Sequence, residues 1–135
     1  MEEGKFENFL WEIDQEGSNK PHHDLEVWQR SVQFVRKIYE ITEDFPDEEK
    51  FSLVQQMRRA ATSISSNIAE GAARRSSKDF NNFLGIAQGS NAELETQLLI
   101  SLELGYVSQE TISELYSELN ELSRMIIGLR KSLSE

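Results

Sequence analysis

Cysteine is absent from this sequence of 135 residues, and histidine and proline each occur only twice. The absence of cysteine excludes disulfides, thiolate zinc sites and cysteine nucleophiles, and it fits a reducing cytoplasm. Both histidines, His22 and His23, precede the long helices expected below. The inward-facing Glu-x-x-His pairs of di-iron bundles therefore cannot form, and no phosphate-binding glycine motif occurs. We expect neither a metal nor a cofactor.

Long apolar runs are also missing, since none approaches the ~18 residues of a membrane-spanning helix. The first twenty residues are acidic where a signal peptide would be basic, so we expect a cytoplasmic protein. Catalysis would depend on carboxylates alone. Glu93 and Glu95 are two residues apart and point to different faces of a helix, so we expect no enzyme activity.

The charge that is present is acidic and uneven. The formal net charge is -10, yet residues 57–79 carry five basic and two acidic side chains. Residues 1–24 carry seven acidic side chains and two lysines. The basic cluster predicts a nucleic-acid-binding surface, because arginines at helix ends and free backbone N–H groups suit phosphate. Its candidate residues are Arg58, Arg59, Arg74, Arg75 and Lys78.

Four segments repeat apolar residues at steps of three and four, which indicates helices. We expect these helices over residues 24–42, 47–70, 77–104 and 108–133, with a short amphipathic helix near residues 6–13. Asp24 and Ser76 are expected N-caps, and Gly71 and Gly105 expected helix ends. The apolar face expected for the first long helix is Leu25, Trp28, Val32, Val35 and Tyr39.

No segment shows sustained strand alternation, so the fold class is all-α. Four long helices with short connections imply an antiparallel up-down-up-down four-helix bundle. The bundle would occupy residues 24–135, after an acidic N-terminal extension of residues 1–23.

Small residues share helix faces where a larger side chain would be expected. Gly85 and Gly89 share one face of the helix expected over residues 77–104, and each glycine inside a helix costs about 1 kcal/mol relative to alanine. Close backbone approach, either within the bundle or between subunits, should offset this cost. A second small-residue face lies on the helix expected over residues 47–70, and the two faces could meet. The candidate close-contact residues are Ala60, Ser63, Asn67, Gly85, Gly89 and Ala92.

Polar residues also interrupt the expected apolar seams. Asn91 lies between Ala87 and Leu94, and Asn67 and Glu70 lie near the end of the second long helix. Buried polar groups need partners. We therefore expect a buried polar cluster of Asn67, Glu70, Asn91 and Glu93, which either fixes the register of the helices or binds a ligand.

Two motifs, QMRRAATSISSNIAEG and FLGIAQGSNAELETQL, carry a family resemblance that extends over roughly residues 25–130. The sequence resembles the four-helix-bundle family of 23S rRNA intervening-sequence proteins. The resemblance implies an antiparallel four-helix bundle assembled as a ring-like homopentamer. Relatives act as accessory proteins of diversity-generating retroelements and bind nucleic acid through a basic surface. This chain differs in its acidic charge and in its N-terminal extension.

Two interpretations of the arginines remain. In the first, the protein is a non-catalytic oligomer whose arginine cluster binds RNA, mainly through contacts to the phosphate backbone of the RNA. In the second, the arginines pair with acidic residues within or between subunits, and the protein is a protein-interaction scaffold that binds no nucleic acid. The extension could be disordered, or it could dock on a neighbouring subunit through Phe6, Phe9, Leu10 and Trp11.

Overall fold

The structure is a computed structural model that describes residues 4–18 and 20–134, and within these ranges it contains helices and no β-strand. The α-helices are α1 (Lys5–Gln15), α2 (Glu26–Thr42), α3 (Leu53–Ala72), α4 (Ser77–Glu103) and α5 (Gln109–Ser134). Two short 3₁₀ helices, η1 (Pro21–Asp24) and η2 (Asp47–Glu49), precede α2 and α3. The all-helical prediction is therefore confirmed.

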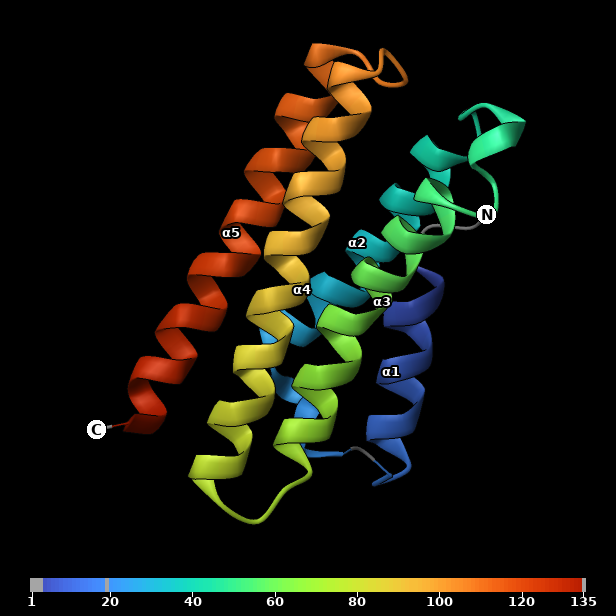
Figure 1. Cartoon of the computed structure of the whole chain (residues 1–135). Helices are drawn as coiled ribbons and strands as arrows, with labels where there is room; N and C mark the ends of the chain where they lie inside the picture. The colour runs from blue at the N-terminus through green and yellow to red at the C-terminus, as the bar shows by residue number, and fades with distance from the viewer. Residues whose placement is uncertain (1–3, 19, 135) are drawn as a thin grey trace.

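The four long helices α2–α5 pack side by side around one apolar core, and consecutive helices run in opposite directions (Figure 1). α3 packs mainly on α4, α4 on α5, and α2 on both α3 and α5. Each large apolar side chain removed from water stabilises the fold by about 1.5–3 kcal/mol. Fully buried core residues include Phe34, Ile38, Met57, Ile64, Ile68, Leu84, Leu94, Leu98, Leu119, Leu122 and Ile126.

Several predicted features of the helices are confirmed. The backbone N–H of Asp79 donates to the Ser76 hydroxyl at 3.1 Å, so Ser76 caps α4 as expected. Gly105 follows α4 with a φ of 78°, a left-handed conformation that suits glycine at a helix end. On α5 the apolar seam from Ile112 to Ile126 is buried.

Three predicted helix ends are wrong. Asp47, Glu48 and Glu49 form η2 instead of the first turn of α3, which begins only at Leu53. Asp24 ends η1, and Leu25 is the N-cap of α2. Gly71 does not end α3. It is buried in the last turn, where a Cβ atom would lie 2.8 Å from Cβ of Phe83, so close packing on α4 explains this glycine.

The predicted apolar face of α2 is right only in part, because Leu25, Trp28 and Val35 pack against the core but are only partly buried. The residues that α2 buries are Val27, Ser31, Phe34, Ile38 and Thr42. The expected residues lie on a neighbouring stripe, where Trp28 is half-buried and Tyr39 is 40% exposed. α2 has two apolar stripes, and periodicity alone does not decide which one faces the core.

The second stripe of α2 is covered near its start by the N-terminal segment of the same chain. The Phe6 ring meets the Trp28 ring edge-on, with centroids 5.4 Å apart. The Gln33 amide also donates to the Glu7 carboxylate. Phe9 and Trp11 remain 61% and 65% exposed. α1 therefore packs on the outside of α2 and contributes no buried residue to the core.

Candidate nucleic-acid interface

The five cations predicted to bind nucleic acid fall into two groups at different heights along α3. Arg58 and Arg59 lie within α3, whereas Arg74 and Arg75 lie in the turn after it and Lys78 lies in the first turn of α4. Fourteen residues separate Arg58 from the end of α3 at Ala72, and a helix rises about 1.5 Å per residue. The groups are therefore about 21 Å apart and do not form one patch.

Arg58 holds α3 to the C-terminal end of α2. Its Nε donates to the Thr42 hydroxyl at 3.0 Å, and its Nη2 donates to the backbone carbonyl of Tyr39 at 3.3 Å. The guanidinium lies over the Tyr39 ring, 4.3 Å from its centroid. These bonds join Arg58 to two oxygens in the last turn of α2 and support the structural interpretation for Arg58, although three of its five N–H groups make no hydrogen bond to the described residues.

The Arg59 side chain, unlike that of Arg58, makes no hydrogen bond to α2. Arg59 is exposed, and no hydrogen bond or ion pair joins its side chain to the other residues that the structure describes. It lines an open groove of about 440 Å³ at the junction of α2, η2 and α3. The groove is lined by Tyr39, Lys50, Phe51, Val54, Gln55, Arg58, Arg59 and Thr62.

At the other end of α3, one cation is paired and two are not. Arg74 forms an ion pair with Glu70, with 3.1 Å between Nη2 and Oε1, and its guanidinium lies 4.8 Å from the centroid of the Phe83 ring. Arg75 and Lys78 are exposed, and no hydrogen bond or ion pair joins either side chain to the other described residues. Exposed pairs such as Arg74–Glu70 contribute at most about 1 kcal/mol.

The small residues of α3 contact α4 within the same chain. Ala60 is buried, and the hydroxyls of Ser63 and Ser90 lie 2.8 Å apart. The Asn67 amide donates to the Ser63 carbonyl at 2.8 Å and to its hydroxyl at 3.0 Å. Within the chain this face meets α4 at Ser90 and not at Gly85 or Gly89; its contact with the glycine face of another subunit stays a prediction.

Gly85 makes room for an arginine of α5. A Cβ atom at this position would lie 3.3 Å from both terminal nitrogens of Arg130. Arg130 crosses α4 there and donates to Asn81 Oδ1 and to Gln88 Oε1, each at 2.8 Å. Gly89 is exposed with open space beside it, and Ala92 is exposed too. The two predicted glycines thus have different environments.

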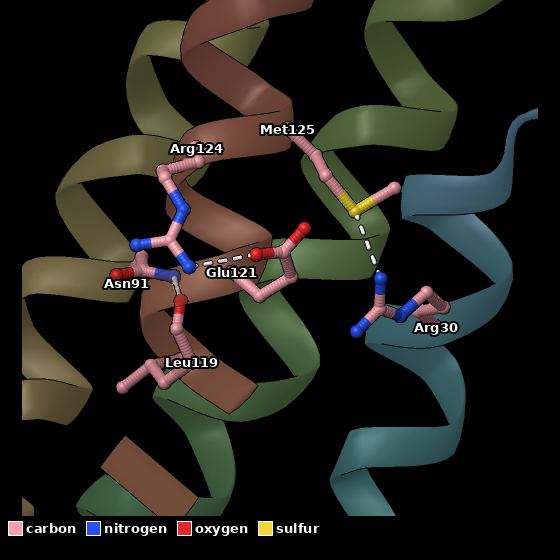
Figure 2. A network of polar contacts seen from close by, with 6 residues as sticks. All are labelled: Arg30, Asn91, Leu119, Glu121, Arg124 and Met125. Carbon is pink, nitrogen blue, oxygen red and sulfur yellow. Dashed lines mark hydrogen bonds and ion pairs between the residues drawn. The ribbon is translucent and has the colours of Figure 1, made fainter. Parts of the chain in front are cut away.

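The predicted buried polar cluster does not form. Asn91 is 5% exposed, and its amide donates to the Leu119 carbonyl of α5 at 2.9 Å (Figure 2). Asn67 is half-buried, whereas Glu70 and Glu93 are exposed. Of the four predicted residues, only Asn91 links two helices from within the core, while the two carboxylates point to solvent, where their charge is hydrated.

Arginines outside the predicted cluster also hold helices together. Figure 2 shows the Glu121 carboxylate between Arg124 on the same helix and Arg30 on α2. Nη2 of Arg124 lies 2.7 Å from this carboxylate, and Nη1 of Arg30 donates to the Met125 sulfur at 3.4 Å. The hydrogen bond from Arg124, its charge and the charge of Arg30 lower the pKa of Glu121. Much of the basic charge is therefore structural.

Sequence reasoning missed the residues that make the groove distinctive. Phe51 precedes Val54 and Met57 at helical spacing and would be assigned to the core, but it lies in the turn before α3 and is 81% exposed. Helical periodicity assigns Tyr39 to the apolar face of its helix. The acidic run before Lys50 suits a separate turn better than a continuous helix, and this signal could have placed Phe51 outside α3.

The described residues contain no group of three His, Asp or Glu side chains that could hold a metal ion. None of their helices is both long enough and apolar enough to cross a membrane. The fold and the site together define a helical protein that presents two separate sets of exposed cations.

The chain belongs to the 23S rRNA-intervening sequence protein family, whose family model matches residues 23–128. A solved structure from Bacteroides thetaiotaomicron, described as a protein of unknown function from the S23 ribosomal protein family, is similar to it with 28% identity and a TM-score of 0.72. The similarity covers 78% of this chain and 95% of that one. No significant match to a curated protein was found.

Proposed function

We propose that this protein is a non-catalytic RNA-binding protein of the cytoplasm. In the proposal, residues 24–135 form an antiparallel four-helix bundle that assembles as a ring-like homo-oligomer, and residues 1–23 extend it. The observation that carries the RNA proposal is the exposure of Arg59, Arg75 and Lys78 without partners among the described residues, in a chain of net charge -10. The family description, which links its members to 23S rRNA, supports RNA as the ligand class.

Phosphate contacts of this kind produce a characteristic dependence on salt. Each neutralised phosphate releases a counterion, so the logarithm of the affinity falls by roughly 0.7–0.9 per contact for each tenfold rise in salt. A ring of subunits would repeat the exposed cations and multiply the effect. The net negative charge of the rest of the chain opposes non-specific adhesion. Binding should therefore be strong only where RNA reaches the exposed cations.

The test is a salt titration of binding to a structured rRNA fragment. The variant Arg59→Ala/Arg75→Ala/Lys78→Ala should lower the salt slope by about two to three per protein chain. The matched control Lys5→Ala/Lys20→Ala/Lys131→Ala removes the same charge from exposed positions elsewhere and should change the slope little. If the wild type binds no RNA at low salt, the proposal is wrong. Equal slopes in the two variants would also contradict it.

Self-association is supported by the outward face of α4. Ile86, Leu99 and Ile100 are 52%, 45% and 42% exposed, and Gly89 and Ala92 lie exposed between them. Exposed apolar side chains around small residues fit close contact with another helix. Sedimentation should show an oligomer that Leu99→Glu disrupts and Ser117→Glu, exposed on α5, leaves intact. A wild-type monomer would refute this part of the proposal.

A further inference from the structure

We propose that the groove between Tyr39, Phe51 and Arg59 holds one unpaired nucleotide of a bound RNA, with its base stacked on Phe51 and its phosphate on the groove's cations. This inference rests on the proposed function and adds the kind of RNA element recognised. The groove has about 440 Å³ of space. Pockets that hold small ligands span roughly 300–1,000 Å³, so the space suits one nucleotide.

The aromatic surface of the groove is available for stacking. Phe51 is 81% exposed, although burying such a side chain would stabilise the fold. Tyr39 is 40% exposed and already carries the Arg58 guanidinium over its ring. Unpaired bases are recognised by stacking on aromatic rings and on guanidinium planes. The groove therefore offers two surfaces that a base could use.

The charge of the groove suits a phosphate group. Its lining includes Lys50, Arg58 and Arg59 and no acidic residue. The Lys50 ammonium lies 5.6 Å from the centroid of the Phe51 ring, so cation and ring are adjacent. Arg58 is fixed by its bonds to α2 but keeps three free N–H groups. Arg58 is therefore preorganised, which reduces the entropy that this side chain loses on binding.

The surroundings limit the site to a short piece of RNA. Asp47 and Glu48 lie in η2 directly before Lys50, and both are exposed. Their charges repel a phosphate backbone that continues along this side. A single nucleotide flipped out of a stem can reach the three cations while the stem stays beyond these carboxylates. A bulged or looped base is therefore favoured over a continuous duplex.

The cations at the other end of α3 provide an internal comparison. Arg75 and Lys78 are exposed there, and the Arg74 guanidinium lies over the Phe83 ring as Arg58 lies over Tyr39. Phe80 and Phe83 are half-buried, however, whereas Phe51 in the groove is 81% exposed. That end can contact the phosphates of a duplex, but it offers an unpaired base less aromatic surface for stacking than the groove does.

The test compares two RNA stems that differ by one bulged uridine, using the full-length protein. Wild type should bind the bulged stem more tightly than the perfect stem, and Phe51→Ala should weaken binding to the bulged stem about tenfold, as expected for loss of one base–aromatic stack. Phe51→Trp should keep the preference. Phe9→Ala is the control, because Phe9 is also highly exposed at 61% but lies outside the groove. Unchanged melting of Phe51→Ala would show that it folds.

A photo-crosslink identifies the contact directly. A 4-thiouridine at the bulge should attach to the tryptic peptide of residues 51–58, which carries Phe51 and Arg58. Equal binding of both stems, unaffected by Phe51→Ala, would overturn the groove inference and leave the proposed function intact. If no RNA binds at low salt, the proposed function fails first. If a peptide of the acidic residues 4–18 displaces the bulged RNA and binds more tightly, the groove is a protein site and the inference is wrong.

Discussion

The contact between Gly71 and α4 allows a quantitative prediction about the turn that presents Arg74 and Arg75. A Cβ atom on residue 71 would lie 2.8 Å from Cβ of Phe83, 2.9 Å from Cδ1 of Phe80 and 3.2 Å from the Phe80 carbonyl oxygen. Two of these atoms are fixed to the α4 backbone and cannot rotate away. Gly71→Ala therefore requires α3 and α4 to separate.

The balance of two terms gives the magnitude. Overpacking costs about 1–3 kcal/mol, and alanine returns up to about 1 kcal/mol of helix propensity. The free energy of unfolding should therefore fall by about 1–2 kcal/mol. For a chain of this size, about 3–5 °C of melting temperature corresponds to 1 kcal/mol, so Tm should fall by about 3–10 °C.

The assay is thermal and urea unfolding followed by circular dichroism at one protein concentration, because self-association would shift Tm. Gly128→Ala is the matched control. Gly128 is an exposed residue of α5 whose added Cβ would meet nothing within 4 Å, so alanine should stabilise by up to about 1 kcal/mol. If Gly71→Ala is neutral or stabilising while Gly128→Ala behaves as expected, the close packing at the end of α3 is wrong.

Two further predictions concern contacts between segments. Arg130→Ala removes the hydrogen bonds to Asn81 and Gln88 and should lower the free energy of unfolding by about 1–3 kcal/mol. The control Lys131→Ala, at an exposed position, should change this free energy by at most about 0.5 kcal/mol. Equal effects of the two variants in urea unfolding would contradict the contact between Arg130 and α4. Burial, then the charges of His23 and Lys20, lower the pKa of His22 from 6.5. The unfolded state therefore binds the proton first, and stability should fall as pH drops below 6.5 towards the lower folded pKa. The Trp28 ring lies 4.6 Å from His22 and 5.4 Å from His23, so its fluorescence is read in a Trp11→Phe background with and without His22→Gln. The part of the titration that His22→Gln removes should have its midpoint below pH 6.5 in folded protein, and a midpoint at or above 6.5 would refute this.

The sequence predicts the helices well where one apolar stripe dominates. α5 is the clearest case, because its seam of leucine and isoleucine leaves only one face to bury. α2 is harder, because Phe34 and Ile38 share the helix with the equally apolar stripe of Trp28 and Val35. Packing against α3 and α5 decides between the stripes, and periodicity contains no information about that packing.

The candidate site is predicted less well, because it depends on how turns and helices meet. The sequence shows that arginines are concentrated between residues 57 and 79, but not that Arg58 bonds to α2 while Arg59 faces solvent. It also cannot show that Arg130 lies against Gly85, since that contact requires the register of α5 on α4. Adjacent residues on a helix diverge by about 100°, so a charge cluster in sequence need not be one surface.

The separation of the two cation groups along α3 sets a minimum length for any RNA that engages both. Charges along one strand of a nucleic-acid duplex are spaced roughly 3 Å apart along the axis, so the distance of about 21 Å corresponds to roughly six to eight nucleotide steps. A shorter RNA can bind one group at a time. Above that length the second contact becomes intramolecular, and affinity should rise abruptly because of the high effective concentration. The affinity would then depend on the length of the RNA, independently of its base sequence.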